Sequence, residues 1–255
     1  PTPTPTPTPT PPPTGNFNTA ETRMSDGVNF HGAITAYQAG ATGQGVLAGV
    51  IDDGIDQDSP EFAGRISAQS ADVAGSRGIN GEGTHGTNVA QVLLGGKNDA
   101  GTFGIAFNAS LLVLRADRPG SCASEDPSND ESGCRFPEVA IAAGLVRAVS
   151  AGARVVNISL GGEDPPGATL RAAVSPATPP GNIVIVSAGN EGDTTANGND
   201  PNNPDRFAQG LRDAGGGLVV IAGAVNDRGA ISGFSNRAGG YAGSSLSAVG
   251  EGGGD

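Results

Sequence analysis

Three polar side chains in this sequence are of the kinds that enzymes use for acyl transfer. Asp52 ends an apolar run, His85 lies in the glycine-rich stretch at residues 83–87, and Asn190 follows a later apolar run. A carboxylate can hold an imidazole in one tautomer, so that the imidazole takes a proton from a nucleophile as a general base. An asparagine amide can donate a hydrogen bond to the oxyanion that forms. The three residues therefore predict nucleophilic catalysis at a carbonyl group.

The sequence has two histidines, and their surroundings differ. Glycines flank His85, and the apolar residues at 89–94 have helical spacing, so a helix that begins at His85 would hold the imidazole rigidly. A histidine at a helix start can also be purely structural, but the accompanying carboxylate and amide favour the catalytic interpretation. His31 begins an expected short helix at residues 29–39, and its neighbours suggest no chemistry. We expect His31 to be structural.

Apolar runs and helical patterns alternate along the chain, and these elements must position the three side chains. The predicted strands are residues 46–51, 111–116, 153–160, 183–187 and 218–225. The predicted helices are residues 29–39, a helix from His85, and residues 137–151, 169–174 and 206–213. This alternation predicts an α/β fold with a mostly parallel, doubly wound sheet and right-handed crossovers. Sites in such sheets form at the carboxyl ends of strands, where Asp52 and Asn190 are expected.

Composition excludes several classes of function. The 255 residues include 43 glycines and only 4% aromatic residues, which suits one large α/β domain with an aliphatic core. A formal net charge of −12 argues against nucleic acid and anionic membrane surfaces as partners. A loose dinucleotide fingerprint at residues 43–48 precedes a strand instead of following one, so nucleotide binding is not expected. No apolar run is long enough to cross a bilayer.

The chain begins with alternating proline and threonine, which cannot pack a core and favours extended polyproline II structure. We interpret residues 1–17 as a linker and residues 18–255 as the catalytic domain. The linker would connect this domain to something upstream, such as a membrane anchor or a segment attached to the cell surface.

The only two cysteines, Cys122 and Cys134, lie in one polar segment. Their spacing is not that of a zinc motif, and no histidine is nearby in the sequence. A disulfide on a surface loop, far from the catalytic cleft, is the simpler interpretation. A disulfide would indicate an oxidising compartment.

Four segments of the sequence resemble motifs of the subtilisin-like serine proteases, the subtilase family (peptidase S8). Residues 50–56 resemble the aspartate motif, residues 83–90 the histidine motif, residues 156–162 the substrate-binding strand, and residues 187–192 the oxyanion asparagine motif. The resemblance covers the chain from about Thr42 onward. It implies a three-layer subtilisin-like fold and a secreted serine endopeptidase. The proline-threonine leader and the loop cysteines are similar to those of bacterial autotransporter subtilases.

The resemblance also implies roles for single residues. Asp52 would orient the imidazole, His85 would act as general base and then general acid, and Asn190 would donate to the oxyanion. Substrate backbone, from a polypeptide, would pair along Ser159, Leu160 and Gly161. The protein would be extracellular or lie on the bacterial cell surface. No cofactor is expected and no metal is assigned. Calcium sites stay unassigned, and the loop at residues 197–205 is interpreted as solvated.

The sequence departs from the family pattern in two places. Asp53 stands where most subtilases carry Ser or Thr. It would lie at the cleft edge and favour a cationic substrate side chain, or it would cap a backbone N–H in the turn at Gly54. The nucleophile motif Gly-Thr-Ser-x-Ala-x-Pro is absent, and its nearest imitation, residues 243–249 around Ser245, lacks the proline. Residues 246–251 resemble the strand and turn that precede this motif. We therefore expect the domain to be incomplete at its C-terminus, without its nucleophilic serine.

A second function class stays open from the sequence. A subtilase-like domain without a nucleophile could be a non-catalytic module that binds peptides or another protein. The retention of an aspartate, a histidine and an asparagine argues against this alternative, because a binding module needs none of them.

Overall fold

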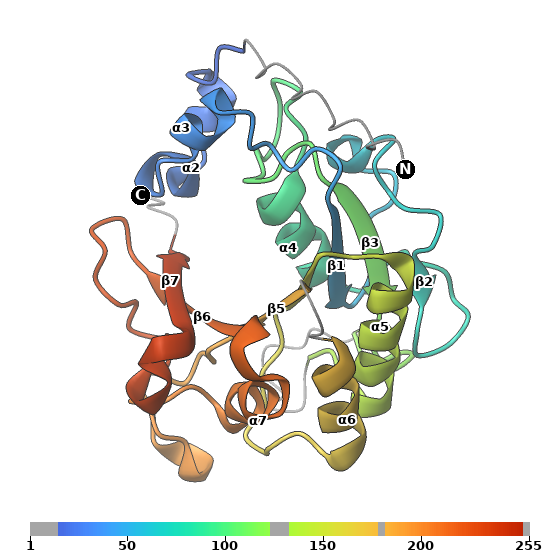
Figure 1. Ribbon diagram of the computed structural model, residues 1–255, viewed down its shortest axis with the longest axis vertical. Coiled ribbons are helices and arrows are strands. Elements are labelled where there is room, and N and C mark those ends of the chain that lie inside the picture. The colour runs from blue at the N-terminus through green and yellow to red at the C-terminus, as the bar shows by residue number, and fades with distance from the viewer. Residues whose placement is uncertain (1–14, 123–132, 178–181, 252–255) are drawn as a thin grey trace, which may run out of the picture.

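Seven strands form one sheet at the centre of the molecule (Figure 1). The computed structural model describes residues 15–122, 133–177 and 182–251. The strands are β1 (Leu47–Asp52), β2 (Ala71–Asp72), β3 (Ser110–Arg115), β4 (Val155–Ile158), β5 (Ile183–Ser187), β6 (Val219–Val225) and β7 (Ser245–Val249). Their order across the sheet is β2-β3-β1-β4-β5-β6-β7, and every adjacent pair of these described strands is parallel. The predicted α/β class is confirmed.

The described helices are α1 (Ala20–Arg23), α2 (Asp26–Phe30), α3 (Ala33–Gln38), α4 (His85–Leu94), α5 (Glu138–Ala151), α6 (Ala168–Ala177) and α7 (Arg206–Gly215). One face of the sheet is covered by α4, and the other by α5, α6 and α7. Four short 3₁₀ turns are also described, at Pro60–Phe62, Ala196–Gly198, Gly216–Leu218 and Gly239–Ser244. Figure 1 shows α4 on one side of β1 and β3, with α5 and α6 on the other. These layers are the three-layer architecture expected for a subtilisin-like fold.

The two buried central strands supply side chains to both faces in alternation. On β3, Leu111 and Val113 join the core beneath α4, whereas Leu112 and Leu114 join the core beneath α5, α6 and α7. On β1, Ile51 packs on the α5 side. Because successive strand residues point to opposite faces, a continuous apolar run is what a strand covered on both sides requires.

The N-terminal helices differ from the prediction. The expected helix at residues 29–39 is two short helices, α2 and α3, because Gly32 between them has φ +66°, in the left-handed region that ends a helix. These helices pack with an aromatic cluster of Phe17, Tyr37, Phe103 and Phe107. The cores on the two faces of the sheet are mainly aliphatic, as the composition predicts. The aromatic cluster is separate from both.

Phe17 also bears on the domain boundary. Its side chain is 4% exposed within the aromatic cluster, so the folded part includes Phe17, one residue before the predicted start. The proline-threonine tract at residues 1–14 lies outside the described residues. No helix in the described part of the chain combines the length and apolar character needed to cross a membrane.

Candidate active site

Asp52 and His85 form a hydrogen-bonded pair at the carboxyl edge of the sheet. Asp52 is the last residue of β1, and His85 is the first residue of α4. The Nδ1 atom of His85 lies 2.8 Å from Oδ1 and 3.0 Å from Oδ2 of Asp52. The hydrogen bond to Asp52 raises the pKa of His85; burial of the ring opposes this, and the negative charges of Asp52 and Asp53 add to the rise. The side chain of Asp52 is 1% exposed and that of His85 is 54% exposed.

Such a pair leaves one ring nitrogen for chemistry. With Nδ1–H donating to the carboxylate, the neutral imidazole presents Nε2 as a proton acceptor. The buried carboxylate fixes the ring orientation, and the exposed half of the ring can meet a reacting group. This arrangement suits a general base. A purely structural histidine would not need to expose half of its ring.

Gly86 allows this close approach of α4 to β1. A Cβ atom at this position would overlap the carbonyl oxygen of Gly54 and lie 2.7 Å from Oδ1 of Asp53. Gly54 itself has φ +100°, a backbone conformation that residues other than glycine rarely adopt. Close contact with backbone atoms at this strand end therefore requires glycine at both Gly54 and Gly86.

Asn190 lies in the same cleft as His85. Both residues line a cavity of about 540 Å³, and Asn190 is exposed there. The preceding Gly189 has φ +104°, which turns the chain sharply after β5. The backbone N–H of Asn190 donates to Oε2 of Glu191 at 2.9 Å, and the N–H of Glu191 donates to the buried Asn236 at 2.8 Å. These bonds fix the loop that carries the asparagine.

The predicted substrate strand borders the same cavity. Ser159, Leu160 and Gly161 follow β4 directly, and all three line the cavity with His85. The carbonyl of Leu160 accepts a hydrogen bond from the hydroxyl of Ser187 at 2.7 Å, which ties this segment to β5. The cleft thus has an imidazole, an exposed amide and the backbone segment that follows β4 around one space.

Comparisons with known proteins identify the family of this chain. A family model described as the subtilase family matches residues 43–254. The chain belongs to the subtilase family. Among its curated relatives, an alkaline protease of Alkalihalobacillus alcalophilus is 35% identical over 163 residues, covering 63% of this chain and 38% of the relative. Subtilisin BL of Lederbergia lenta is 34% identical over 163 residues, covering 63% of this chain and 53% of the relative. Thermitase of Thermoactinomyces vulgaris is 31% identical over 162 residues, covering 62% of this chain and 52% of the relative.

The matched part of this subtilase chain therefore spans between about two fifths and half of these relatives. The comparisons establish the family and the fold to which the strands, helices and motifs belong.

The structure places Asp53 differently from the first interpretation of the sequence. Its side chain is 0% exposed, so it cannot contact a substrate at the cleft edge. Oδ1 accepts a hydrogen bond from the backbone N–H of Gly86 at 2.7 Å, in the first turn of α4. The alternative, a backbone cap, is closer to the finding, although the capped group belongs to Gly86 and not to the turn at Gly54. Burial raises the pKa of Asp53 to about 6, against the Gly86 hydrogen bond, which lowers it.

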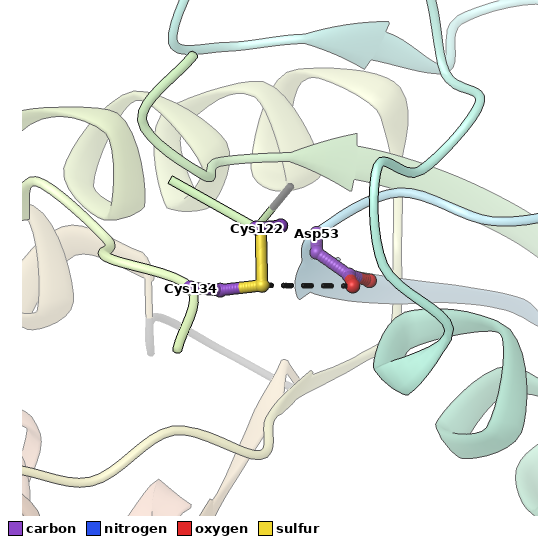
Figure 2. Close-up of side chains that lie close together, drawn as sticks. All are labelled: Asp53, Cys122 and Cys134. Atoms are coloured by element: carbon purple, nitrogen blue, oxygen red, sulfur yellow. Dashed lines mark hydrogen bonds between the residues drawn. A yellow bond between two sulfur atoms is a disulfide. The ribbon is translucent and has the colours of Figure 1, made fainter. Parts of the chain in front are cut away.

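The cysteine pair also lies where the sequence did not predict it. Cys122 and Cys134 form a disulfide as predicted, but the disulfide is not far from the cleft. Cys122 is buried, and Cys134 lines a second cavity of about 570 Å³ together with His85. The Sγ atom of Cys134 is 3.9 Å from Oδ2 of Asp53 (Figure 2). The polar residues around the cysteines led us to predict a disulfide on the surface. The cysteines instead lie beside Asp53, at the carboxyl end of β1.

Metal binding can be tested on this cluster. Within the described residues, one group of three side chains of metal-ligand type has its ligand atoms within 4.8 Å of one another: Asp53, Cys122 and Cys134. The thiolate is the form of cysteine that binds metals, and a disulfide has none. The oxidised cluster does not fit a metal ion.

Several residues that organise the subtilase site carried no strong signal in the sequence. The charged residues Arg77, Arg115, Asp72, Asp117 and Glu82 form an ion-pair network that holds the chain leading to His85. Asp117 is fully buried between the two guanidinium groups, at 2.8 Å from Arg77 and 2.7 Å from Arg115. Only the three-dimensional structure brings these charges together.

Asp205 is the other residue that was missed. It is 5% exposed, and it accepts hydrogen bonds from the backbone N–H groups of Ala208 at 2.7 Å and Gly162 at 3.1 Å. It therefore joins the start of α7 to the substrate segment. Burial raises the pKa of Asp205 to about 7, even though these hydrogen bonds favour the charged form. An aspartate directly before a helix is a usual N-cap signature. This pattern could have indicated the hydrogen bond from Ala208, but not the one from Gly162.

The nearest imitation of a nucleophile motif lies apart from this centre. Ser245 begins the edge strand β7, its hydroxyl donates to the carbonyl of Tyr241 at 2.9 Å, and it lines neither cavity that contains His85.

In the loop at residues 197–205, Asn199 donates to the carbonyls of Glu191 and Thr194, both at 2.6 Å. These hydrogen bonds organise that loop through amide and carbonyl groups.

Proposed function

We propose that this chain carries the Asp–His part of the catalytic centre of a secreted serine endopeptidase. The observation that supports this most strongly is the 2.8 Å contact between Asp52 and a half-exposed His85, in a cavity shared with Asn190. Asp52 orients the imidazole and stabilises the imidazolium. His85 takes the proton of a serine hydroxyl and later gives it to the leaving amine.

Asn190 is proposed as the side-chain donor to the oxyanion. Its amide is exposed in the cavity, on a loop fixed by Glu191 and Asn236. A donor held in place before the reaction stabilises developing charge without a cost for reorganisation, and losing one typically slows the reaction by about 100- to 1,000-fold. Ser159, Leu160 and Gly161 are proposed to pair with the backbone of a polypeptide substrate.

The nucleophile is proposed to be a serine outside residues 1–255. Ser245 is engaged with Tyr241, and the cleft serines Ser159 and Ser187 each take part in a hydrogen bond with a neighbouring residue. The disulfide supports export to an oxidising compartment, where a linker at residues 1–17 would attach the domain to a cell-surface anchor.

A fluorophosphonate probe, which labels activated serines, tests this proposal on a longer protein that includes the coding sequence downstream of Asp255. We expect one labelled serine in that protein and peptide hydrolysis. Replacement of His85 or Asp52 by alanine should lower kcat by about 10⁴-fold or more. Labelling of Ser245 would overturn the proposed nucleophile. A longer protein that binds peptides but has no labelled serine would instead support the non-catalytic alternative.

A further inference from the structure

Asp53 lies between the start of α4 and the disulfide. Oδ1 accepts the hydrogen bond from the N–H of Gly86, directly after His85. Oδ2 lies 3.9 Å from the Sγ atom of Cys134, and a dashed line in Figure 2 marks this contact. On another side, Gly83 packs so closely that a Cβ atom there would overlap Oδ2. The carboxylate is therefore enclosed by α4, by the loop before it and by the sulfur atoms.

The two oxygens of this carboxylate differ in their hydrogen bonding. A sulfur atom in a disulfide has no hydrogen to donate. Within the described part of the chain, no N–H or O–H group donates to Oδ2, whereas Oδ1 has the N–H of Gly86. A buried carboxylate with one unsatisfied oxygen favours its protonated form. The raised pKa of Asp53 agrees with this geometry.

Reduction would change the partner of Oδ2. A dithiol reductant breaks the sulfur–sulfur bond, and Cys122 and Cys134 each become a thiol while the dithiol is oxidised to its own disulfide. The Sγ–H of Cys134 can then donate a hydrogen bond to Oδ2. This hydrogen bond favours the negatively charged form of Asp53, beside Asp52 and His85.

We propose that Asp53 and the Cys122–Cys134 disulfide form one positioning element for His85, which couples the redox state of the cysteines to the protonation of the imidazole. Asp53 acts through the Gly86 N–H and through its charge, and it does not touch substrate. The significance for catalysis rests on the proposed role of His85 as general base. The coupling itself is a property of the folded chain and exists whether or not a nucleophile is present.

Other charges also face the imidazole. Asp52 contacts it directly, and the walls of the two cavities that it lines carry Glu138, Glu163, Asp164, Glu191, Asp200, Asp205 and Arg206. None of these residues contains sulfur, so reduction leaves their chemistry unchanged. A comparison of oxidised and reduced protein therefore isolates the contribution of Asp53 and the cysteines.

The chain offers a direct measurement because His85 and His31 are its only histidines. The ring signals of both residues can be followed by NMR as a function of pH, before and after reduction with a dithiol. We expect the titration midpoint of His85 to move upward on reduction. His31, whose Nε2 accepts a hydrogen bond from the N–H of Val249 at 3.2 Å, is the internal control and should not respond.

Two variants separate this coupling from a general loosening of the structure. In Asp53→Asn the amide oxygen can still accept from Gly86, but no charge can form, so the His85 midpoint should be lower and insensitive to the reductant. In the double variant Cys122→Ser/Cys134→Ser the midpoint should be raised without reductant, because a serine hydroxyl can donate to Oδ2. If reduced wild type unfolds, this double variant provides the comparison.

The proposal is overturned if reduced protein, with its two thiols verified by mass spectrometry, has the same His85 midpoint as oxidised protein. It is also overturned if Asp53→Asn responds to the reductant as wild type does, or if the folded double-serine variant titrates like the oxidised protein. Failure of the proposed protease function would appear as absent fluorophosphonate labelling in the longer protein. That result would leave these titrations unaffected.

Discussion

Two buried carboxylates, Asp53 and Asp205, each cap the start of a helix beside the cleft. Asp53 accepts from Gly86 in α4, and Asp205 accepts from Ala208 in α7. Helix N-termini favour negative charge, but burial favours the neutral acid, and for both residues burial is the larger effect. Their pKa values of about 6 and about 7 are therefore well above the ordinary value of 3.8 for aspartate.

The raised pKa of Asp205 gives a prediction for stability. The folded state binds the proton more tightly than the unfolded state, so the stabilisation is fully present below the unfolded pKa of 3.8 and is lost as the pH rises toward about 7. The unfolding free energy of wild type should fall across this range. In Asp205→Asn the fall should be smaller, because one contributing group no longer titrates.

Urea denaturation in buffers near pH 4.5 and pH 7.5 measures this difference. The matched control is Asp227→Asn, which makes the same change of charge on an exposed side chain. Asp227→Asn should retain the pH dependence of wild type. An Asp205→Asn variant with the full wild-type dependence would show that Asp205 is ionised throughout this pH range, contrary to the prediction.

At the scale of elements, the decisive contact is that between the end of β1 and the start of α4. It brings Asp52 and His85 together, and Gly86 is the residue that permits it. The helix cannot be moved away without breaking the hydrogen bond from Gly86 to Asp53 and lengthening the one between His85 and Asp52.

Replacing Gly86 by alanine should disrupt this contact. The new methyl group would overlap the carbonyl of Gly54, and overpacking of this kind costs about 1–3 kcal/mol of unfolding free energy. The His85 pKa should also fall, because the distance to Asp52 increases. Gly217→Ala is the control, since no atom lies within 4 Å of its new methyl group, and should change stability by less than about 0.5 kcal/mol. Equal stability of the two variants would contradict the close-contact argument.

The elements of the site were largely predictable, because long apolar runs and glycine-bounded motifs are local patterns. The strand ending at Asp52, the helix beginning at His85 and the sheet class were found as expected. The two-residue strand β2 was too short to carry a pattern. The contact between Asp53 and Cys134 joins positions 81 residues apart, so no local pattern could show that Asp53 is enclosed instead of exposed.

At the scale of the whole molecule, the sheet separates two aliphatic cores. The larger core lies beneath α5, α6 and α7, and the smaller one beneath α4, next to the strand end that bears Asp52. Each core depends on alternate side chains of the same strands. Packing in the larger core therefore also stabilises the strands that hold the site. None of the helices over this core carries Asp52 or His85.

Leu145 tests the larger core. It lies on α5 and is 0% exposed, whereas its neighbour Val146 is 56% exposed. Leu145→Ala should lower the unfolding free energy by about 2–5 kcal/mol, through lost burial and the cavity left behind. Val146→Ala on the same helix should change it by less than about 0.5 kcal/mol. Chemical denaturation of the two variants compares them, and similar losses would argue against the placement of α5.

The strand order has a consequence for how the chain is made. β1 is the first strand to be synthesised and lies in the interior of the sheet, and from β4 to β7 each strand pairs with a neighbour that precedes it in the chain. A growing polypeptide can therefore extend this side of the sheet one strand at a time, in the order of translation. On the other side, β1 and β2 are both made before β3, the strand that pairs with each of them. At roughly 5–20 residues per second, each new edge meets its next strand within seconds, which limits the time for pairing with another chain.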